Sequence, residues 1–340
     1  MSSGLQFYVT TLLVYACVDM MACWALNLQY GVTGLLNFAF ILFQAAGAYT
    51  AAVLALPLQT ANGGFQQYIL GLGLPFPWTV LGAGLAGGVL ALAIGLISLR
   101  KLRTDYEAVV MLVVSIIATT AVSNFVPLFN GSAGVSLVPN PFDGLNVDPL
   151  VETWLYVGLA AVAALLTFAF AQRVTNSPFG RSLRAVRENE AAAAAVGKNV
   201  ARLRLLMFVV GGVIAAMSGG VLVGFIGLWA PSAWLYPETL VIFAAVIIGG
   251  RGNNVGAAVG ALLVPVAFNE ATRFLPQVGN PALIDALQWV VIALLILAFL
   301  WFRPQGIVPE RRRVFPAARP GANPADRRVA ESMAPSGGSR

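Results

Sequence analysis

Histidine is absent from the 340-residue sequence, and cysteine occurs only twice. Without histidine, the chain lacks the most common general base and one of the most common metal ligands in proteins. Cys17 and Cys23 lie in the same apolar run, where packing in the protein interior is a simpler interpretation than a disulfide framework. We therefore expect no catalytic site, no metal site and no cofactor on this chain.

Charged residues are also scarce, at 10% of the sequence, whereas 59% of the residues are hydrophobic. A water-soluble domain carries about 25% charged residues, because its surface must be hydrated. A chain this apolar must expose its surface to lipid, so the sequence predicts an all-α, polytopic bundle of transmembrane helices. Residues 1–7 contain no Lys or Arg. The basic region of a cleaved signal peptide is thus missing, and the first apolar run is predicted to be a retained span.

Apolar runs of suitable length predict about nine spans, within a range of eight to ten, since a bilayer core requires roughly 20 residues per helix. The predicted spans are 5–26, 35–56, 78–99, 108–129, 149–170, 205–228, 239–250, 255–268 and 282–302. The segments 239–250 and 255–268 are short. They form either two abbreviated helices or one element that is broken around residues 249–254.

Basic residues are distributed unevenly along the chain. Eighteen of the twenty Lys and Arg residues fall in 100–103, 173–204 and the segment from 303 onward. The positive-inside rule places 100–107, 172–204 and the C-terminus in the cytoplasm, and the N-terminus and the loops 57–77 and 129–149 outside. We predict a permease-type membrane domain over 1–307 and a disordered basic tail over 308–340, in the inner (plasma) membrane. Contact with anionic membrane lipid explains the tail better than nucleic-acid binding does.

The cytoplasmic segment 172–204 has the most specific pattern. Ser177-Pro178 is typical of a helix start, and the alanine run 191–195 favours a continuing helix that Gly197 can end. Asn199 can cap the next span. Arg181, Arg184 and Arg187 are spaced along one face. These features predict a short, stiff helix that docks in a groove of another protein, the alternative being a solvated loop helix.

This segment resembles the cytoplasmic coupling loop of ABC-importer permeases, and more narrowly that of the branched-chain amino acid permease family of the LivM type. The residues that carry the resemblance and would form the contact with an ATPase are Ser177, Gly180, Arg181, Arg184, Arg187, Glu188, Glu190, Ala192 and Gly197. Similar stretches at 25–36, 47–50, 102–106 and 301–306 extend the resemblance over most of the chain. Two departures are the seven-residue step from Glu190 to Gly197, one longer than the general pattern, and the absence of a His that many relatives carry near 36–40.

The resemblance implies a permease subunit of an ABC importer with discontinuous helices, moving branched-chain or other small amino acids; urea or a short amide is the alternative substrate. No Gly-x-x-x-x-Gly-Lys-Ser/Thr phosphate loop occurs in the sequence, so ATP hydrolysis is expected on separate ATPase subunits. The other partners it implies are a second homologous permease subunit and a periplasmic or lipid-anchored substrate-binding protein.

Two glycine-interrupted segments with amide side chains are candidates for the translocation pathway, because broken helices are tolerated in membranes where they line a cavity or are buried in protein. The candidates are Asn27, Gln29, Gly31, Gly34, Asn37 and Gln44 in the first segment, and Gly249, Gly250, Asn253 and Asn254 in the second. The alternative for the glycines is close helix packing.

An ion-coupled secondary transporter is the main competing interpretation, with a channel or membrane scaffold as a third. Such a transporter would need carboxylates or histidines deep in several spans, and only Asp19 is placed in this way. It would also leave the basic segment 172–204 without a role.

Overall fold

The computed structural model describes residues 3–58, 66–101, 104–145, 148–268, 270–271 and 281–310. Residues 311–340 of the predicted tail lie outside the described residues. The elements are α1 (Ser3–Leu26), η1 (Asn27–Val32), α2 (Phe40–Ala55), α3 (Phe76–Lys101), α4 (Thr104–Asn124), α5 (Val126–Phe129), η3 (Gly131–Ala133), β1 (Val135–Ser136), η4 (Asp143–Leu145), α6 (Pro149–Asn176), α7 (Pro178–Glu188), α8 (Glu190–Ala195), α9 (Val200–Ile226), β2 (Leu228–Trp229), η5 (Pro231–Trp234), α10 (Tyr236–Gly249), α11 (Asn254–Ala261), η6 (Leu262–Phe268) and α13 (Pro281–Phe302).

The predicted α-helical membrane bundle is confirmed. Six helical segments of the described chain are long and apolar enough to cross a membrane: Gly4–Val32, Phe76–Leu99, Tyr106–Asn124, Pro149–Asn176, Val200–Ile226 and Pro231–Gly249. Three shorter apolar helices cover Phe40–Ala55, Asn254–Phe268 and Leu287–Phe302. Each of the nine predicted spans corresponds to one of these nine segments.

Several predicted boundaries were wrong by about five residues, for local reasons. α2 begins at Phe40 rather than at residue 35, because Gly34 adopts a left-handed turn (φ +80°) and the Asn37 side chain accepts a hydrogen bond from the backbone N–H of Ala39. α6 continues to Asn176, and α9 begins at Val200. Helices that reach beyond the lipid can continue until a cap ends them, so hydropathy alone does not place their ends.

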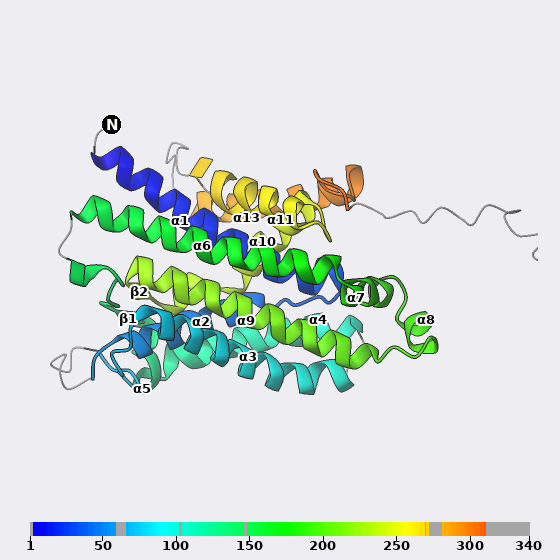
Figure 1. Ribbon diagram of the computed structural model, residues 1–340, viewed down its shortest axis with the longest axis horizontal. Helices are drawn as coiled ribbons and strands as arrows, with labels where there is room; N and C mark the ends of the chain where they lie inside the picture. Colours follow the sequence, from blue (N-terminus) through cyan, green and yellow to red (C-terminus); the bar gives the residue numbers. More distant parts are fainter. Residues whose placement is uncertain are drawn as a thin grey trace, which may run out of the picture. The chain divides into compact units, whose positions relative to one another are not determined.

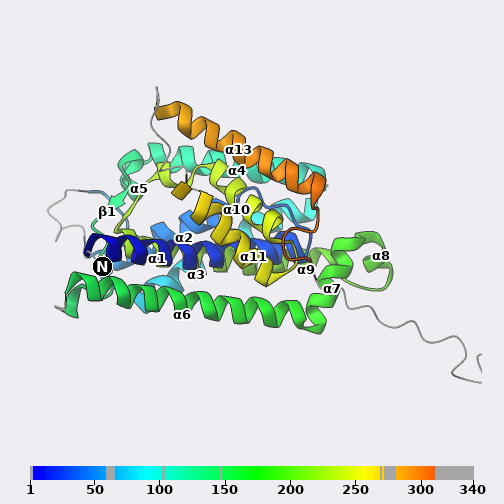
Figure 2. The ribbon, with the colours of Figure 1, turned by 90° about the horizontal axis from the view of Figure 1, so that it is seen from above.

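The centre of the bundle is α9, which packs against α1, α2 and α3. Its small residues allow backbones to touch: a Cβ on Gly219 would lie 1.9 Å from the carbonyl oxygen of Gln44, and one on Gly47 of α2 would lie 2.0 Å from that of Ala216. Close approach through small residues is the usual basis of helix packing in membranes. Figure 2 shows α6 along one edge of the bundle and α4 and α13 along the other.

The two ends of the bundle carry different structures (Figure 1). The end that we call the β end holds the start of α1, α5 and the antiparallel pair of β1 and β2, in which Val135 is opposite Trp229. The opposite end, which we call the loop end, holds α7, α8 and the residues that follow α13. The segments 129–145 and 177–199 therefore lie at opposite ends of the bundle.

Candidate functional site

The loop-end segment begins as its sequence predicts. Ser177 caps α7, because its Oγ accepts a hydrogen bond from the backbone N–H of Gly180 at 3.1 Å, and Pro178 occupies the first helical position. Gly180 is required by space: a Cβ there would lie 2.5 Å from the carbonyl oxygens of Val174 and Thr175. The tight turn between α6 and α7 thus fixes the direction in which α7 leaves the bundle.

The prediction of one continuous docking helix was wrong. The chain breaks at Asn189, which is extended (φ −158°, ψ 106°), and its side chain accepts a hydrogen bond from the backbone N–H of Ala192 at 3.0 Å. Asn189 therefore ends α7 and caps α8, since an Asn side chain can replace a helical backbone bond. The predicted turn at Gly197 is confirmed (φ +82°), as is the cap of α9 by Asn199, which accepts from the Arg202 N–H at 3.0 Å.

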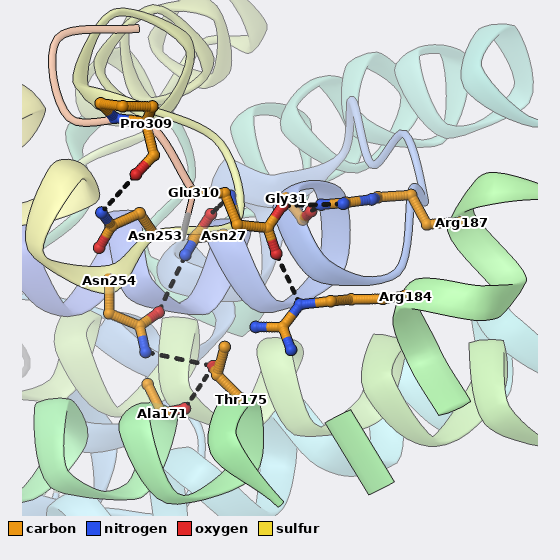
Figure 3. Close-up of polar contacts among 11 residues, drawn as sticks. Asn27, Gly31, Ala171, Thr175, Arg184, Arg187, Asn253, Asn254, Pro309 and Glu310 are labelled. Atoms are coloured by element: carbon orange, nitrogen blue, oxygen red, sulfur yellow. Dashed lines mark hydrogen bonds and ion pairs between the residues drawn. The ribbon is translucent and has the colours of Figure 1, made fainter. Parts of the chain in front are cut away.

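The sequence predicted that the three arginines of α7 share one outward face, and this prediction was wrong. Arg181 is exposed, whereas Arg184 and Arg187 turn toward the protein and hold the same carboxylate, that of Glu310. Arg184 Nε lies 2.6 Å from one Glu310 oxygen and Arg187 Nη2 lies 2.8 Å from the other. Arg187 also donates to the carbonyl oxygen of Gly31 in η1 (Figure 3). Arg187 therefore links α7 to the interrupted end of the first span.

Glu310 belongs to a segment that we call the C-terminal strap, residues 303–310. The backbone N–H groups of Ile307 and Val308 donate to the carbonyl oxygens of Ile248 and Gly249, at 2.8 and 3.0 Å. These bonds satisfy carbonyls at the end of α10 that a helix terminus leaves unpaired. Residues 308–310, which the sequence assigns to the tail, are among the described residues and belong to this strap.

The two predicted pathway segments meet at a pair of buried amides (Figure 3). Asn27 Nδ2 donates to Asn254 Oδ1 at 2.9 Å, and Asn27 Oδ1 accepts from the backbone N–H of Gly252 at 2.8 Å. Asn254 Nδ2 in turn donates to Gln172 Oε1 at 2.9 Å and to Thr175 Oγ1 at 3.2 Å, both on α6. This network joins η1, the α10–α11 connection and the end of α6.

Gln29 and Asn37 of the first segment are also hydrogen-bonded. Gln29 Nε2 donates to the carbonyl oxygen of Phe208 on α9 at 2.9 Å, and Gln29 Oε1 accepts from Asn37 Nδ2 at 3.0 Å. Both side chains are completely buried, and Gln44 is 5% exposed. In this conformation Gln29 and Asn37 form a buried crosslink between η1, the turn before α2, and α9. Their role in translocation stays a prediction.

The choice left open for residues 239–268 is resolved as two separate helices, of which only the second belongs to a segment shorter than a membrane span. α10 and α11 pack side by side. A Cβ on Gly249 would lie 2.1 Å from the carbonyl oxygen of Gly256, and a Cβ on Gly260 would lie 1.8 Å from that of Ala245. Gly250 (φ +127°) makes the turn between them, and the Asn253 side chain caps α11 by accepting from the N–H of Val255. These glycines therefore serve close packing and a tight turn.

The remaining predicted loop residues are open to solvent. Glu188, Ala192 and Gly197 are exposed, and Glu190, at the start of α8, has a side chain that is 46% exposed and lies 3.3 Å from Arg204 Nη1. With Arg181 and Val196, which is 74% exposed, these residues form the outer surface of the α7–α8 segment. This surface, rather than the arginine row, is available to a partner protein.

Sequence patterns did not identify three residues of this site, Glu310, Gln172 and Thr175. A carboxylate eight residues after α13, amid basic residues, was a signal that could have identified Glu310. Gln172 and Thr175 lie three apart near the end of a span, where polar groups usually meet water, so their pattern is uninformative. Only the fold shows that they contact Asn254.

Comparison with known proteins agrees with this architecture. The sequence model of the family described as "Branched-chain amino acid transport system / permease component" matches residues 8–300. The chain is 26% identical to the probable branched-chain amino acid transport permease protein LivM of Methanocaldococcus jannaschii, over 86% of this chain and 90% of the relative. It is also 26% identical to the high-affinity branched-chain amino acid transport system permease protein LivM of Escherichia coli K12, over 92% and 71% of the two chains. The LivH permease of the same organism is 28% identical over 85% and 91%.

A more partial relative is the guanosine ABC transporter permease protein NupQ of Bacillus subtilis, 27% identical over 56% of this chain and 62% of the relative. No solved structure matches the chain. The family match covers most of the sequence, and the helical segments described above are those of a multi-pass membrane protein. The chain belongs to the family of branched-chain amino acid transport system permease components.

Proposed function

We propose that this chain is the membrane-spanning permease subunit of an ATP-driven ABC importer, and that it moves branched-chain or other small amino acids into the cell. The relatives that match over most of the chain are named as branched-chain amino acid permeases. The sequence holds no phosphate loop of the Walker type, so the ATPase is a separate subunit in this proposal. A second homologous permease subunit and a periplasmic or lipid-anchored binding protein complete the assembly.

The observation that carries the proposal is the contact of Arg187 with the Gly31 carbonyl oxygen. It joins the segment that bears the exposed α7–α8 surface to the π-helical end of the first span. Nucleotide-driven closure of ATPase subunits against α7 and α8 would move Arg187, and with it η1 and the C-terminal strap. A discontinuous helix can yield at its break, because fewer backbone bonds hold it there.

The proposal sets the orientation of the chain in the membrane. The loop end carries Arg181, Arg184, Arg187, Lys198 and Arg202, so by the positive-inside rule it faces the cytoplasm, where ATP is present. The β end then faces outward and receives substrate from the binding protein. Substrate selection rests largely with that protein, and the chain itself supplies the moving part of the pathway.

A reconstituted transporter tests the proposal. The chain is purified with its partner permease and ATPase subunits and placed in liposomes, and uptake of labelled leucine is measured with the binding protein added outside. We expect uptake that requires ATP inside, stops with vanadate and survives collapse of the ion gradients. Competition by unlabelled isoleucine but not by guanosine or urea would identify the substrate class.

Two results would contradict the proposal. Uptake that needs an ion gradient and no ATP would instead favour a secondary transporter, with Asp19, halfway along the Gly4–Val32 span, as its ion-coupling group. Efficient competition by guanosine and none by isoleucine would retain the ATP-driven mechanism and replace the substrate.

A further inference from the structure

A second charged cluster lies at the loop end, separate from the junction around Arg187. Arg204, in the second turn of α9, lies between two carboxylates: its Nη2 donates to Glu107 Oε2 of α4 at 2.5 Å, and its Nη1 lies 3.3 Å from Glu190 Oε1 of α8. The Arg204 and Glu107 side chains are 8% and 2% exposed, whereas Glu190 is 46% exposed. The cluster thus has a buried arm and a solvent-facing arm.

The buried arm depends on Arg204. A buried carboxylate is strongly disfavoured unless it is paired and hydrogen-bonded. Glu107 Oε1 has no hydrogen-bond partner in the part of the chain that the structure describes, so the guanidinium on the other oxygen is its main compensation. Any shift of Arg204 would therefore either displace Glu107 with it or leave the buried Glu107 carboxylate without its ion-pair partner.

α4 extends the reach of this cluster. It contacts α2, α3 and α10, and at the β end it contacts η3 and η5. A helix of 21 residues is roughly 30 Å long and moves as a stiff rod. Glu107 lies in the first turn of α4, at the end opposite to η3 and η5. A displacement of Glu107 would consequently move the opposite end of α4, at the β end of the bundle.

We propose that Arg204 is a positioning residue that ties α8 to α4, so that displacement of α8 by the ATPase is carried through Glu190, Arg204 and Glu107 to the β end. The inference rests on the proposed function and adds to it a second linkage, independent of Arg187. α7 acts on the helix breaks through Arg187 and Glu310, whereas α8 acts on the far end of the bundle through Arg204.

The experiment uses the complete transporter in liposomes, with leucine uptake and ATP hydrolysis measured in the same vesicles. Glu107→Gln should lower uptake per ATP hydrolysed about three- to ten-fold, and Glu190→Gln by a smaller factor, with both variants still assembled with the ATPase. Arg202→Gln is the matched control, because Arg202 is an exposed charged residue two positions from Arg204, lies outside the α7–α8 surface and has no ion pair among the described residues. It should behave as the wild type.

The double variant separates a linkage from direct docking. If Glu190 acts through Arg204 on Glu107, the Glu107→Gln/Glu190→Gln variant should match Glu107→Gln alone, because the first substitution already interrupts the linkage that Glu190 needs. If Glu190 instead binds the ATPase directly, the two losses should multiply, and the inference is overturned. Normal uptake per ATP in Glu190→Gln, an exposed change that does not threaten folding, would overturn it as well.

A labelling measurement reports on the far end of α4. Asn124→Cys introduces an exposed thiol at that end, and the native Cys17 and Cys23 are buried. Adding ATP and vanadate should change its reaction rate with a membrane-impermeant thiol reagent in the parent protein, and Glu190→Gln should suppress the change. A parent that transports with ATP but shows no such change contradicts the linkage alone. A parent with no ATP-dependent uptake contradicts the proposed function instead.

Discussion

The guanidinium of Arg187 donates a hydrogen bond to the carbonyl oxygen of Gly31, across 156 residues of sequence. Gly31 lies in the π-helical turn that ends the first span, just before the left-handed turn at Gly34. Carbonyl groups at such a break need partners, because lipid offers none. Arg187 supplies one from a helix outside the bundle, and Glu310 holds the same arginine from the C-terminal strap. The loop, the break and the strap are therefore mechanically connected.

The first prediction concerns that connection. Glu310→Gln removes the negative charge that holds Arg184 and Arg187 together, so the two guanidinium groups should repel and loosen α7. The side chains are 17–29% exposed, and we expect a loss of about 1–2 kcal/mol in the free energy of unfolding. Faster cleavage in limited proteolysis at residues 188–199 should accompany it.

The matched control is Glu188→Gln, which removes an exposed carboxylate from the same helix end and should change the free energy of unfolding by less than about 0.5 kcal/mol. Equal proteolysis of Glu310→Gln and the parent protein would mean that the strap does not restrain α7.

A second prediction tests the close packing of α10 and α11. Gly260→Ala would place a Cβ 1.8 Å from the carbonyl oxygen of Ala245, so the two helices must separate. Overpacking of this kind should cost about 2–3 kcal/mol and lower the Tm in detergent. Gly158→Ala is the control, because a Cβ on this helical glycine of α6 meets nothing within 4 Å. That change should be neutral, or should stabilise the protein by up to about 1 kcal/mol; a similar Tm for both variants would argue against the packing.

Local signals in the sequence predicted much of the loop end. The caps of Ser177 and Asn199 and the left-handed turn at Gly197 depend on one or two residues, and all three are present. The break at Asn189 was missed because the alanine run after it favours a helix, whereas the Asn side chain competes for a backbone N–H.

The contacts that define the site were beyond local patterns. Asn27 and Asn254 are 227 residues apart, and nothing in either segment specifies the other. Hydropathy identified both as unusual polar positions in apolar surroundings, which gave the candidate residues without their partners. Charge counting likewise placed Arg187 in a basic loop, but its inward direction follows from the position of Glu310, which only the fold supplies.

The third prediction addresses the buried amide network. Asn254→Ala removes the acceptor of Asn27 Nδ2 and the donor to Gln172 and Thr175, leaving the buried Asn27 amide without its acceptor. We expect a cost of about 1–3 kcal/mol, at the lower end if polar partners rearrange within the membrane. Thermal unfolding in detergent measures it.

Asn124→Ala provides the comparison, because Asn124 is exposed and, within the described part of the chain, its amide bonds only to the Thr120 carbonyl of its own helix. Its Tm should stay close to that of the parent protein. An Asn254→Ala variant as stable as Asn124→Ala would show that the three elements are held together by packing and not by the amides.

The last prediction separates the conformation of the loop from its contacts. A Cβ on Gly197 meets nothing within 4 Å, so a substitution there acts through the backbone alone. Gly197→Pro forces φ from +82° to about −65°, removes the N–H that donates to the Ala194 carbonyl oxygen, and restricts Val196. The turn from α8 into α9 should be lost while the spans insert normally. Uptake should then fall at least about ten-fold while ATP hydrolysis continues, since α8 no longer holds its position against the ATPase.

Gly197→Asn is the control, because asparagine tolerates the left-handed region, and this variant should keep most of the uptake. If the proline variant transports as well as the asparagine variant, the orientation of α8 has no part in coupling, and the ATPase acts through α7 alone.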